Sequence, residues 1–141
     1  MARDVEDLEE FRSYRLQMNE QIMGAEHLGI KRFFNLDTAA YREGALDKRT
    51  KELLGLVAST VLRCNDCMDY HLNKCVEVGW GDEELHDALN VALVIGGSIV
   101  IPHLRHAFET IGLLREEQRG SNGNNHNHNH NHNHDNHKAK T

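Results

Sequence analysis

The residues best suited to do chemistry lie between Cys64 and Cys75, in the segment CNDCMDYHLNKC. This segment contains all three cysteines of the chain and one histidine, His71. Three kinds of site use such residues: a metal site, a structural disulfide, and a reactive dithiol with its own acid–base partner. On a helix, which turns about 100° per residue, the three cysteines and the histidine would share one face.

A structural zinc site fits this spacing poorly. On a helix, Cys64 and Cys75 would be separated by roughly 16 Å along the axis. Zinc binds thiolate sulfur at about 2.3 Å, so both residues cannot be ligands of one ion. The chain has no second cysteine pair that would complete a Cys₄ or Cys₂His₂ site.

The spacing favours a dithiol. Residues i and i+3 of a helix lie about 5–6 Å apart, which is within the range of α-carbon distances that a disulfide spans. The positive end of the helix dipole stabilises a thiolate at the helix start. His71 follows Cys67 by one turn, where its imidazole can take a proton or return one. The alternative is that the cysteines only fill a core and that His71 is a core histidine.

The elements that position these residues are expected to be helices. Apolar residues recur at helical spacing in 5–24, 46–62, 83–95 and 98–114, and less regularly in 25–46. The CxxC segment is predicted to form a helix over about 65–78 that ends at Gly79. No alternation of period 2 persists, so the sequence predicts an all-α fold of about five to six helices.

Several residues are expected to mark helix ends. Asp47 and Asp82 are predicted N-caps. Asp37 or Thr38 is a further candidate N-cap, with Gly44 as the stop of that helix. The pair Gly96-Gly97 should break the chain, and Pro102 should lie in the first turn of the last helix, where a missing N–H costs least.

The length of the chain and the change of composition at Gly120 predict one helical domain, 1–119, followed by a disordered tail, 120–141. The formal charge of −6 argues against a nucleic-acid partner. No apolar run approaches the roughly 20 residues needed to span a bilayer. The charged start lacks a secretory signal, so we expect a cytoplasmic protein. Thiols are kept reduced in that compartment, which favours a catalytic cysteine pair over a structural one.

The segment from about Phe34 to Leu113 resembles the carboxymuconolactone decarboxylase family, on its alkylhydroperoxidase D side. The resemblance rests on a glutamate, Glu52, twelve residues before a CxxCxxxH motif that opens the next helix. The turn, the acidic helix start and the Gly-Gly pair that follow also match. The resemblance implies a helical fold, a homo-oligomer, and thiol-dependent reduction of peroxides without a metal or an organic cofactor.

The same resemblance implies roles for four residues. Cys67 would be the cysteine that attacks the peroxide, and Cys64, expected to be the more exposed of the two, would resolve the sulfenic acid to a disulfide. His71 and Glu52 would form the proton relay. A dithiol reductant, thioredoxin-like or a lipoyl protein, would then reduce the disulfide. No membrane partner is expected.

This sequence departs from the family pattern inside the CxxC, where Asn65 and Asp66 replace a histidine that some relatives carry. Asp66 would oppose a nearby thiolate but could cap the helix. Two other functions therefore stay open: a decarboxylase or isomerase acting on a lactone-type substrate through His71 and Glu52, and a redox-sensing or metal-binding module without turnover. For Glu52 itself, the alternative is an ordinary charge in a helix's first turn.

Other histidines and the third cysteine are secondary candidates. His103 and His106 could line the pocket, although a position at the surface or core edge is favoured. Cys75 is expected to be buried, with a redox role as the alternative. The tail alternates His and Asn from His126 to His134, and such imidazoles chelate Ni²⁺, Zn²⁺ or Cu²⁺. It is either an engineered tag or a native metal-sequestering tail.

Overall fold

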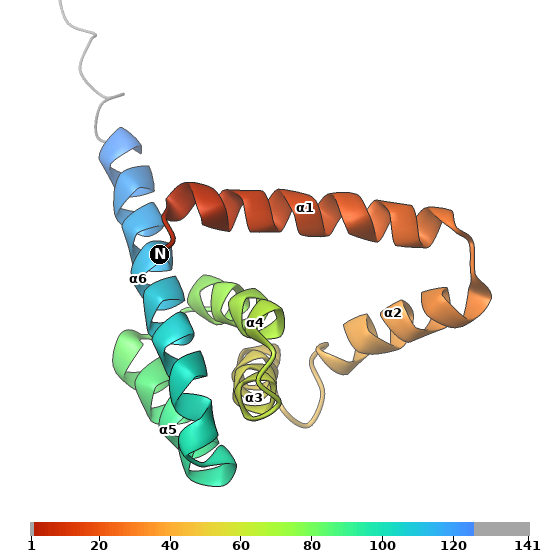
Figure 1. Cartoon of the computed structure of the whole chain (residues 1–141). Coiled ribbons are helices and arrows are strands. Elements are labelled where there is room, and N and C mark those ends of the chain that lie inside the picture. The colour runs from red at the N-terminus through yellow and green to blue at the C-terminus, as the bar shows by residue number, and fades with distance from the viewer. Residues whose placement is uncertain (1, 126–141) are drawn as a thin grey trace, which may run out of the picture.

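The computed structural model describes residues 2–125, and this part of the chain contains six α-helices, one short 3₁₀-helix and no strand (Figure 1). The prediction of an all-α fold of five to six helices is therefore confirmed. The elements are α1 (Val5–Gly24), α2 (Leu28–Ala40), α3 (Lys48–Val61), α4 (Asn65–Glu77), α5 (Asp82–Gly96), η1 (Ser98–Val100) and α6 (Ile101–Asn125).

Local capping explains where α1 and α3 begin. Asp4 accepts a hydrogen bond from the backbone N–H of Asp7, and the Asp7 carboxylate accepts one from the Asp4 N–H, at 3.0 and 2.8 Å. Asp47 caps α3 as predicted, since its Oδ1 lies 2.6 Å from the Thr50 nitrogen. Each pair satisfies backbone donors that have no partner within the helix.

The predicted N-cap at Asp37 or Thr38 is wrong. Both residues lie inside α2, which begins ten residues earlier because His27 acts as its N-cap: the imidazole Nδ1 accepts from the Ile30 N–H at 3.3 Å. Thr38 turns its hydroxyl to the Phe34 carbonyl of the same helix, at 3.0 Å. The helix ends at Ala40, before the predicted stop at Gly44.

Two further boundaries differ from prediction. The N-cap of α5 is Gly81, and Asp82 is the first helical residue; its carboxylate accepts from Arg115 of α6 at 2.7 Å instead of capping the helix. The Gly96-Gly97 break is confirmed, with Gly97 at φ +80°. The helix α6 continues to Asn125, past the predicted start of the tail at Gly120, and the rest of that tail lies outside the described residues.

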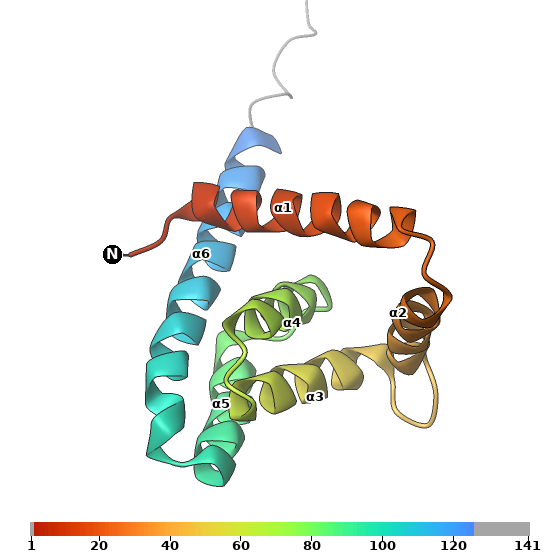
Figure 2. The ribbon, with the colours of Figure 1, turned by 45° about the vertical axis from the view of Figure 1, so that its right-hand side comes forward.

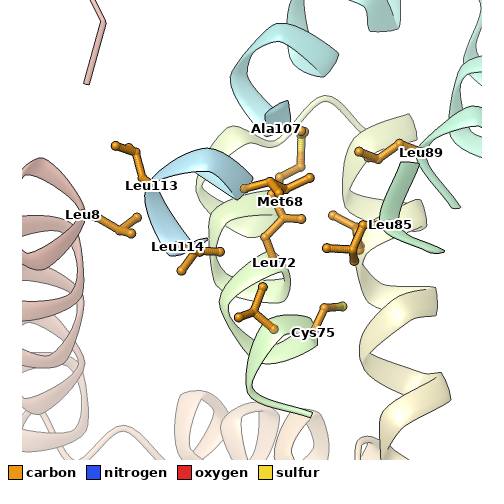
Figure 3. Packing of buried hydrophobic residues seen from close by; sticks show 12 residues of the cluster. Leu8, Met68, Leu72, Cys75, Leu85, Leu89, Ala107, Leu113 and Leu114 are labelled. Atoms are coloured by element: carbon orange, nitrogen blue, oxygen red, sulfur yellow. The ribbon is translucent and has the colours of Figure 1, made fainter. Parts of the chain in front are cut away.

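The helix that carries the CxxC motif is also the centre of the core. Met68, Leu72 and Cys75 form one fully buried stripe along α4. They pack against leucines of α3 and α5 and against the inner face of α6 (Figure 3). Burying one such leucine stabilises the fold by about 1.5–3 kcal/mol. The partners drawn around the stripe include Leu85, Leu89, Ala107, Leu113 and Leu114.

The first two helices form an arm that extends from this core. Figures 1 and 2 show α1 crossing α6 near its C-terminal half and running away from it, and α2 returning toward α3. Leu8 is the only buried residue of α1, and α2 has none. Within residues 2–125 no helix combines the length and the apolar character needed to cross a membrane.

Candidate active site

The turn between α3 and α4 sets the position of the cysteine pair. Cys64 is the N-cap of α4, and its own N–H donates to the Ser59 carbonyl at 3.1 Å. The preceding residue, Arg63, has φ +60°, a left-handed conformation that non-glycine residues seldom adopt. This turn reverses the chain at the end of α3 and brings Cys67 into the first turn of α4.

Cys64 and Cys67 are joined by a disulfide, with their α-carbons 5.3 Å apart. The pairing agrees with the dithiol predicted from the i, i+3 spacing. Cys67 is exposed and Cys64 is half-buried, which is the reverse of the exposure expected from the family resemblance. The reason is that Cys64 sits inside the α3–α4 turn, whereas Cys67 is on the outward side of the first helical turn.

Behind the disulfide lies a buried acid–base pair. Glu52 on α3 is 2% exposed and His71 on α4 is 8% exposed, and Glu52 Oε2 lies 3.1 Å from His71 Nδ1. Glu52 is therefore not a solvated first-turn charge. A carboxylate only accepts hydrogen bonds, so with Glu52 as carboxylate the Nδ1–H group of His71 is the donor of this hydrogen bond. In the neutral imidazole this leaves Nε2 as an acceptor.

Gly55 makes the close approach of His71 to α3 possible, and the sequence reasoning missed it. It lies one turn after Glu52, and a Cβ at this position would be 2.5 Å from Cε1 and 2.7 Å from Nδ1 of the imidazole. Such distances are too short for non-bonded atoms, so only glycine lets the ring rest against the α3 backbone at this point. A glycine inside a strongly helical segment was the available signal.

Tyr41 completes the surroundings of His71 and was also missed. This residue follows the last turn of α2, and its hydroxyl lies 3.4 Å from His71 Nε2. Burial raises the pKa of Tyr41, and the negative charges of Asp37 and Glu52 add to this. The phenol is thus protonated near neutral pH and can donate to Nε2. Nothing in the sequence around Tyr41 signalled this contact.

A cavity of about 380 Å³ opens in front of these residues, between α1, α2 and α4. Cys67, His71 and Tyr41 line it, and Cys64 does not. Phe11, Tyr14 and Tyr70 also contribute aromatic side chains to its walls, and Arg15 of α1 lies over the Tyr70 ring, 4.1 Å from the centroid. A stacked cation of this kind holds the arm and α4 together at the cavity.

The secondary candidates lie outside this cavity. His103 Nδ1 lies 2.8 Å from Oδ1 of Asn65, the residue after Cys64, and His106 Nε2 lies 2.9 Å from the buried Asp69. Cys75 is fully buried, and burial raises its pKa to about 12, so its thiol is neutral at ordinary pH. Among the described residues no group of three His, Cys, Asp or Glu side chains is arranged to hold a metal ion. The histidine-rich tail lies outside those residues.

Two solved structures are similar to this chain. A carboxymuconolactone decarboxylase family protein from Thermotoga maritima, a candidate for involvement in an antioxidative response, is 55% identical, with a TM-score of 0.77 over 79% of this chain and 95% of that one. A second family member, from Legionella pneumophila in its apo form, is 28% identical, with a TM-score of 0.61 over the same shares of the two chains.

One curated relative and one family model also match the sequence of this chain. Uncharacterized protein 4 in the cox locus of Paracoccus denitrificans is 28% identical over 79 residues, which are 56% of this chain and 71% of that protein. The model of the carboxymuconolactone decarboxylase family matches residues 30–110, the range that holds Glu52, the CxxC motif and His71. The chain therefore belongs to the carboxymuconolactone decarboxylase family.

Proposed function

We propose that the protein is a thiol-dependent peroxidase, or disulfide oxidoreductase, of the alkylhydroperoxidase D type. One observation carries the proposal: Cys67, within disulfide reach of Cys64, lines the same cavity as His71. The Nδ1 atom of this histidine is hydrogen-bonded to the buried Glu52. A nucleophile, a resolving thiol and an oriented base are thus grouped where a substrate can enter. The likeness to the Thermotoga protein points in the same direction.

The reaction begins with the reduced pair. His71 takes the proton of the Cys67 thiol, and the imidazolium is stabilised by Glu52 at 3.1 Å. The Cys67 thiolate attacks the terminal peroxide oxygen, the O–O bond breaks, and the products are a Cys67 sulfenic acid and an alcohol or water; the proton that His71 took from the thiol balances the protonation of the leaving oxygen. The Cys64 thiol then attacks the sulfenic sulfur, and the disulfide forms with loss of one water.

An external dithiol closes the cycle. Its thiolate attacks the exposed Cys67 sulfur, Cys64 leaves, and the second thiol of the reductant completes the exchange, so that two electrons pass from the reductant to the pair. A thioredoxin-like or lipoyl protein has this chemistry. We place the cycle in the cytoplasm, where such reductants keep thiols reduced.

The second candidate is a decarboxylase or isomerase that acts on a lactone-type substrate. The buried Glu52–His71 pair, beside a cavity of about 380 Å³, is the observation that favours it. Such a reaction needs acid–base groups and no thiol, so blocking the cysteines would leave it intact. A redox sensor without turnover is the third possibility, and it would form the disulfide without reducing peroxide catalytically.

Intact-mass measurement of the reduced, full-length chain after one equivalent of peroxide tests the proposal, with a chelator present to keep metal ions off the tail imidazoles. The parent should lose two hydrogens within seconds, Cys67→Ser should lose none, and Glu52→Gln should react more slowly. Cys75→Ala, which removes the buried third thiol, is the matched control and should behave as the parent. An unchanged mass in the parent would exclude the peroxidase.

We also propose that the working molecule is a homo-oligomer. The arm formed by α1 and α2 exposes large apolar side chains, of which Phe33 and Leu36 are 67% and 68% exposed. Large apolar side chains left exposed together on one element are what an interface would cover. A second copy of the chain would cover it and support the wall of the cavity.

A further inference from the structure

We infer that Tyr41 is a catalytic residue: its hydroxyl delivers the proton to the departing oxygen when Cys67 cleaves the peroxide bond. The inference rests on the proposed peroxidase function and adds a group that neither the CxxCxxxH motif nor the preceding glutamate contains. It assigns a chemical task to the residue that caps the C-terminal end of α2, a helix with no buried residue.

The Tyr41 hydroxyl lies 3.4 Å from His71 Nε2, and Tyr41, His71 and Cys67 line one cavity. The opposite imidazole nitrogen is engaged by Glu52 at 3.1 Å. The three side chains therefore form a chain of hydrogen bonds that begins at a buried carboxylate and ends at a phenol facing the space where the peroxide must sit.

Near neutral pH the Tyr41 hydroxyl is neutral, because burial and the neighbouring charges of Asp37 and Glu52 raise its pKa. It is therefore a donor. A proton given to the substrate can be replaced from His71, whose Nε2 lies within reach. Other polar groups of the cavity are less suited: Asp37 and Asp66 accept hydrogen bonds when ionised, and Arg15 does not release its proton. Tyr14 and Tyr70 also line the cavity, but among the described residues only the Tyr41 hydroxyl is hydrogen-bonded to His71.

In the proposed step, the Cys67 thiol first gives its proton to His71 Nε2. As the thiolate takes the terminal OH of the hydroperoxide, the alkoxide leaves and receives the Tyr41 proton, and the tyrosinate is reprotonated by the His71 imidazolium. One thiol and one hydroperoxide become one sulfenic acid and one alcohol, and both side chains return to their starting states.

The test compares two oxidants whose leaving groups differ in their need for a proton. The alkoxide expelled from tert-butyl hydroperoxide is strongly basic, whereas the acetate expelled from peracetic acid is stable without protonation. The rate of Cys67 oxidation is measured by rapid quench and intact mass. In Tyr41→Phe we expect the reaction with the hydroperoxide to slow roughly 100-fold, the lower end of general-acid effects, and the reaction with peracetic acid to stay within about twofold.

Tyr70→Phe is the matched control, because it makes the same change in the other tyrosine that contacts His71, at 5.1 Å between ring centroids. Its ratio of the two rates should equal that of the parent. If Tyr41→Phe slows both oxidants equally, or neither, the inference is wrong while the peroxidase proposal stands. A parent that reacts with neither oxidant overturns the proposed function and, with it, this inference.

Discussion

The absence of a Cβ at Gly55 lets His71, the base of the site, lie against α3. Because a Cβ at Gly55 would lie 2.5–2.9 Å from three ring atoms of His71, Gly55→Ala must displace either the imidazole or α3. The Glu52–His71 contact would lengthen, and we expect Cys67 to be oxidised roughly 10- to 100-fold more slowly, within the contribution that acid–base groups make. Helix content by circular dichroism should be preserved.

Gly112→Ala provides the control for this substitution. Gly112 is also helical, but nothing lies within 4 Å of the Cβ that the change would add. Alanine there should stabilise α6 by about 0.5–1 kcal/mol and leave the oxidation rate unaltered. A Gly55→Ala protein that reacts as fast as the parent would show that His71 tolerates displacement.

The thiol of the third cysteine, Cys75, should be unreactive in the folded protein. Burial raises the pKa of Cys75 to about 12, so the thiol stays protonated and unreactive well above neutral pH. The reduced native protein should take up two iodoacetamide adducts at pH 8, and three in guanidinium chloride, as counted by intact mass. A third adduct that forms in the native protein as fast as the first two would contradict the buried, neutral state.

Residue spacing made the cysteine pair and His71 predictable, because a motif within one helix needs no tertiary information, whereas Glu52 was expected only from the family resemblance. Gly55 and Tyr41 could not be found in that way. The role of Gly55 depends on how closely α3 and α4 pack, and Tyr41 reaches His71 only because α2 and the loop after it return toward α4. The exposure order of the cysteine pair likewise depends on the shape of the α3–α4 turn.

At the scale of elements, an ion pair joins the arm to the core. Arg12 of α1 binds both carboxylate oxygens of Glu117 on α6, at 2.6 and 2.8 Å. The hydrogen bond from Arg12 holds the pKa of the Glu117 carboxyl below its ordinary value. A carboxyl with a lowered folded-state pKa contributes stability above its unfolded value, and this contribution disappears as the pH falls through the folded value.

Glu117→Gln should therefore destabilise the protein most at neutral pH. We expect a loss of about 0.5–1 kcal/mol at pH 7, typical of a partly exposed ion pair, with the difference from the parent shrinking below pH 4.5. Thermal unfolding between pH 3 and 7 measures both. Glu116→Gln, at an exposed position without an ion pair among the described residues, should match the parent throughout. A pH-independent difference would mean that the charge is not involved.

The order and type of the helices followed from apolar spacing and caps, and the errors have specific physical causes. His27 caps α2 through its imidazole, a role that histidine seldom takes, so that helix start was misplaced toward Asp37. Asp82 looked like an N-cap because acidic residues favour the start of a helix, yet a more distant cation, Arg115, engages its carboxylate. Local rules cannot anticipate such long-range competition for a side chain.

At the scale of the whole molecule, the arm is too weakly supported to stand alone. A helix of 13 residues is marginal in water without tertiary packing, and α2 has this length with no buried residue and with Phe33 and Leu36 exposed one turn apart. We therefore expect the protein to sediment as an oligomer at micromolar concentration. The double variant Phe33→Glu, Leu36→Glu should shift it to the monomer and lower its melting temperature. Asn35→Glu, which adds one such charge at an exposed polar position of α2, should remain oligomeric. A monomeric parent would mean that the arm is held by the core contacts of α1 alone, and the cavity would then be complete within one chain.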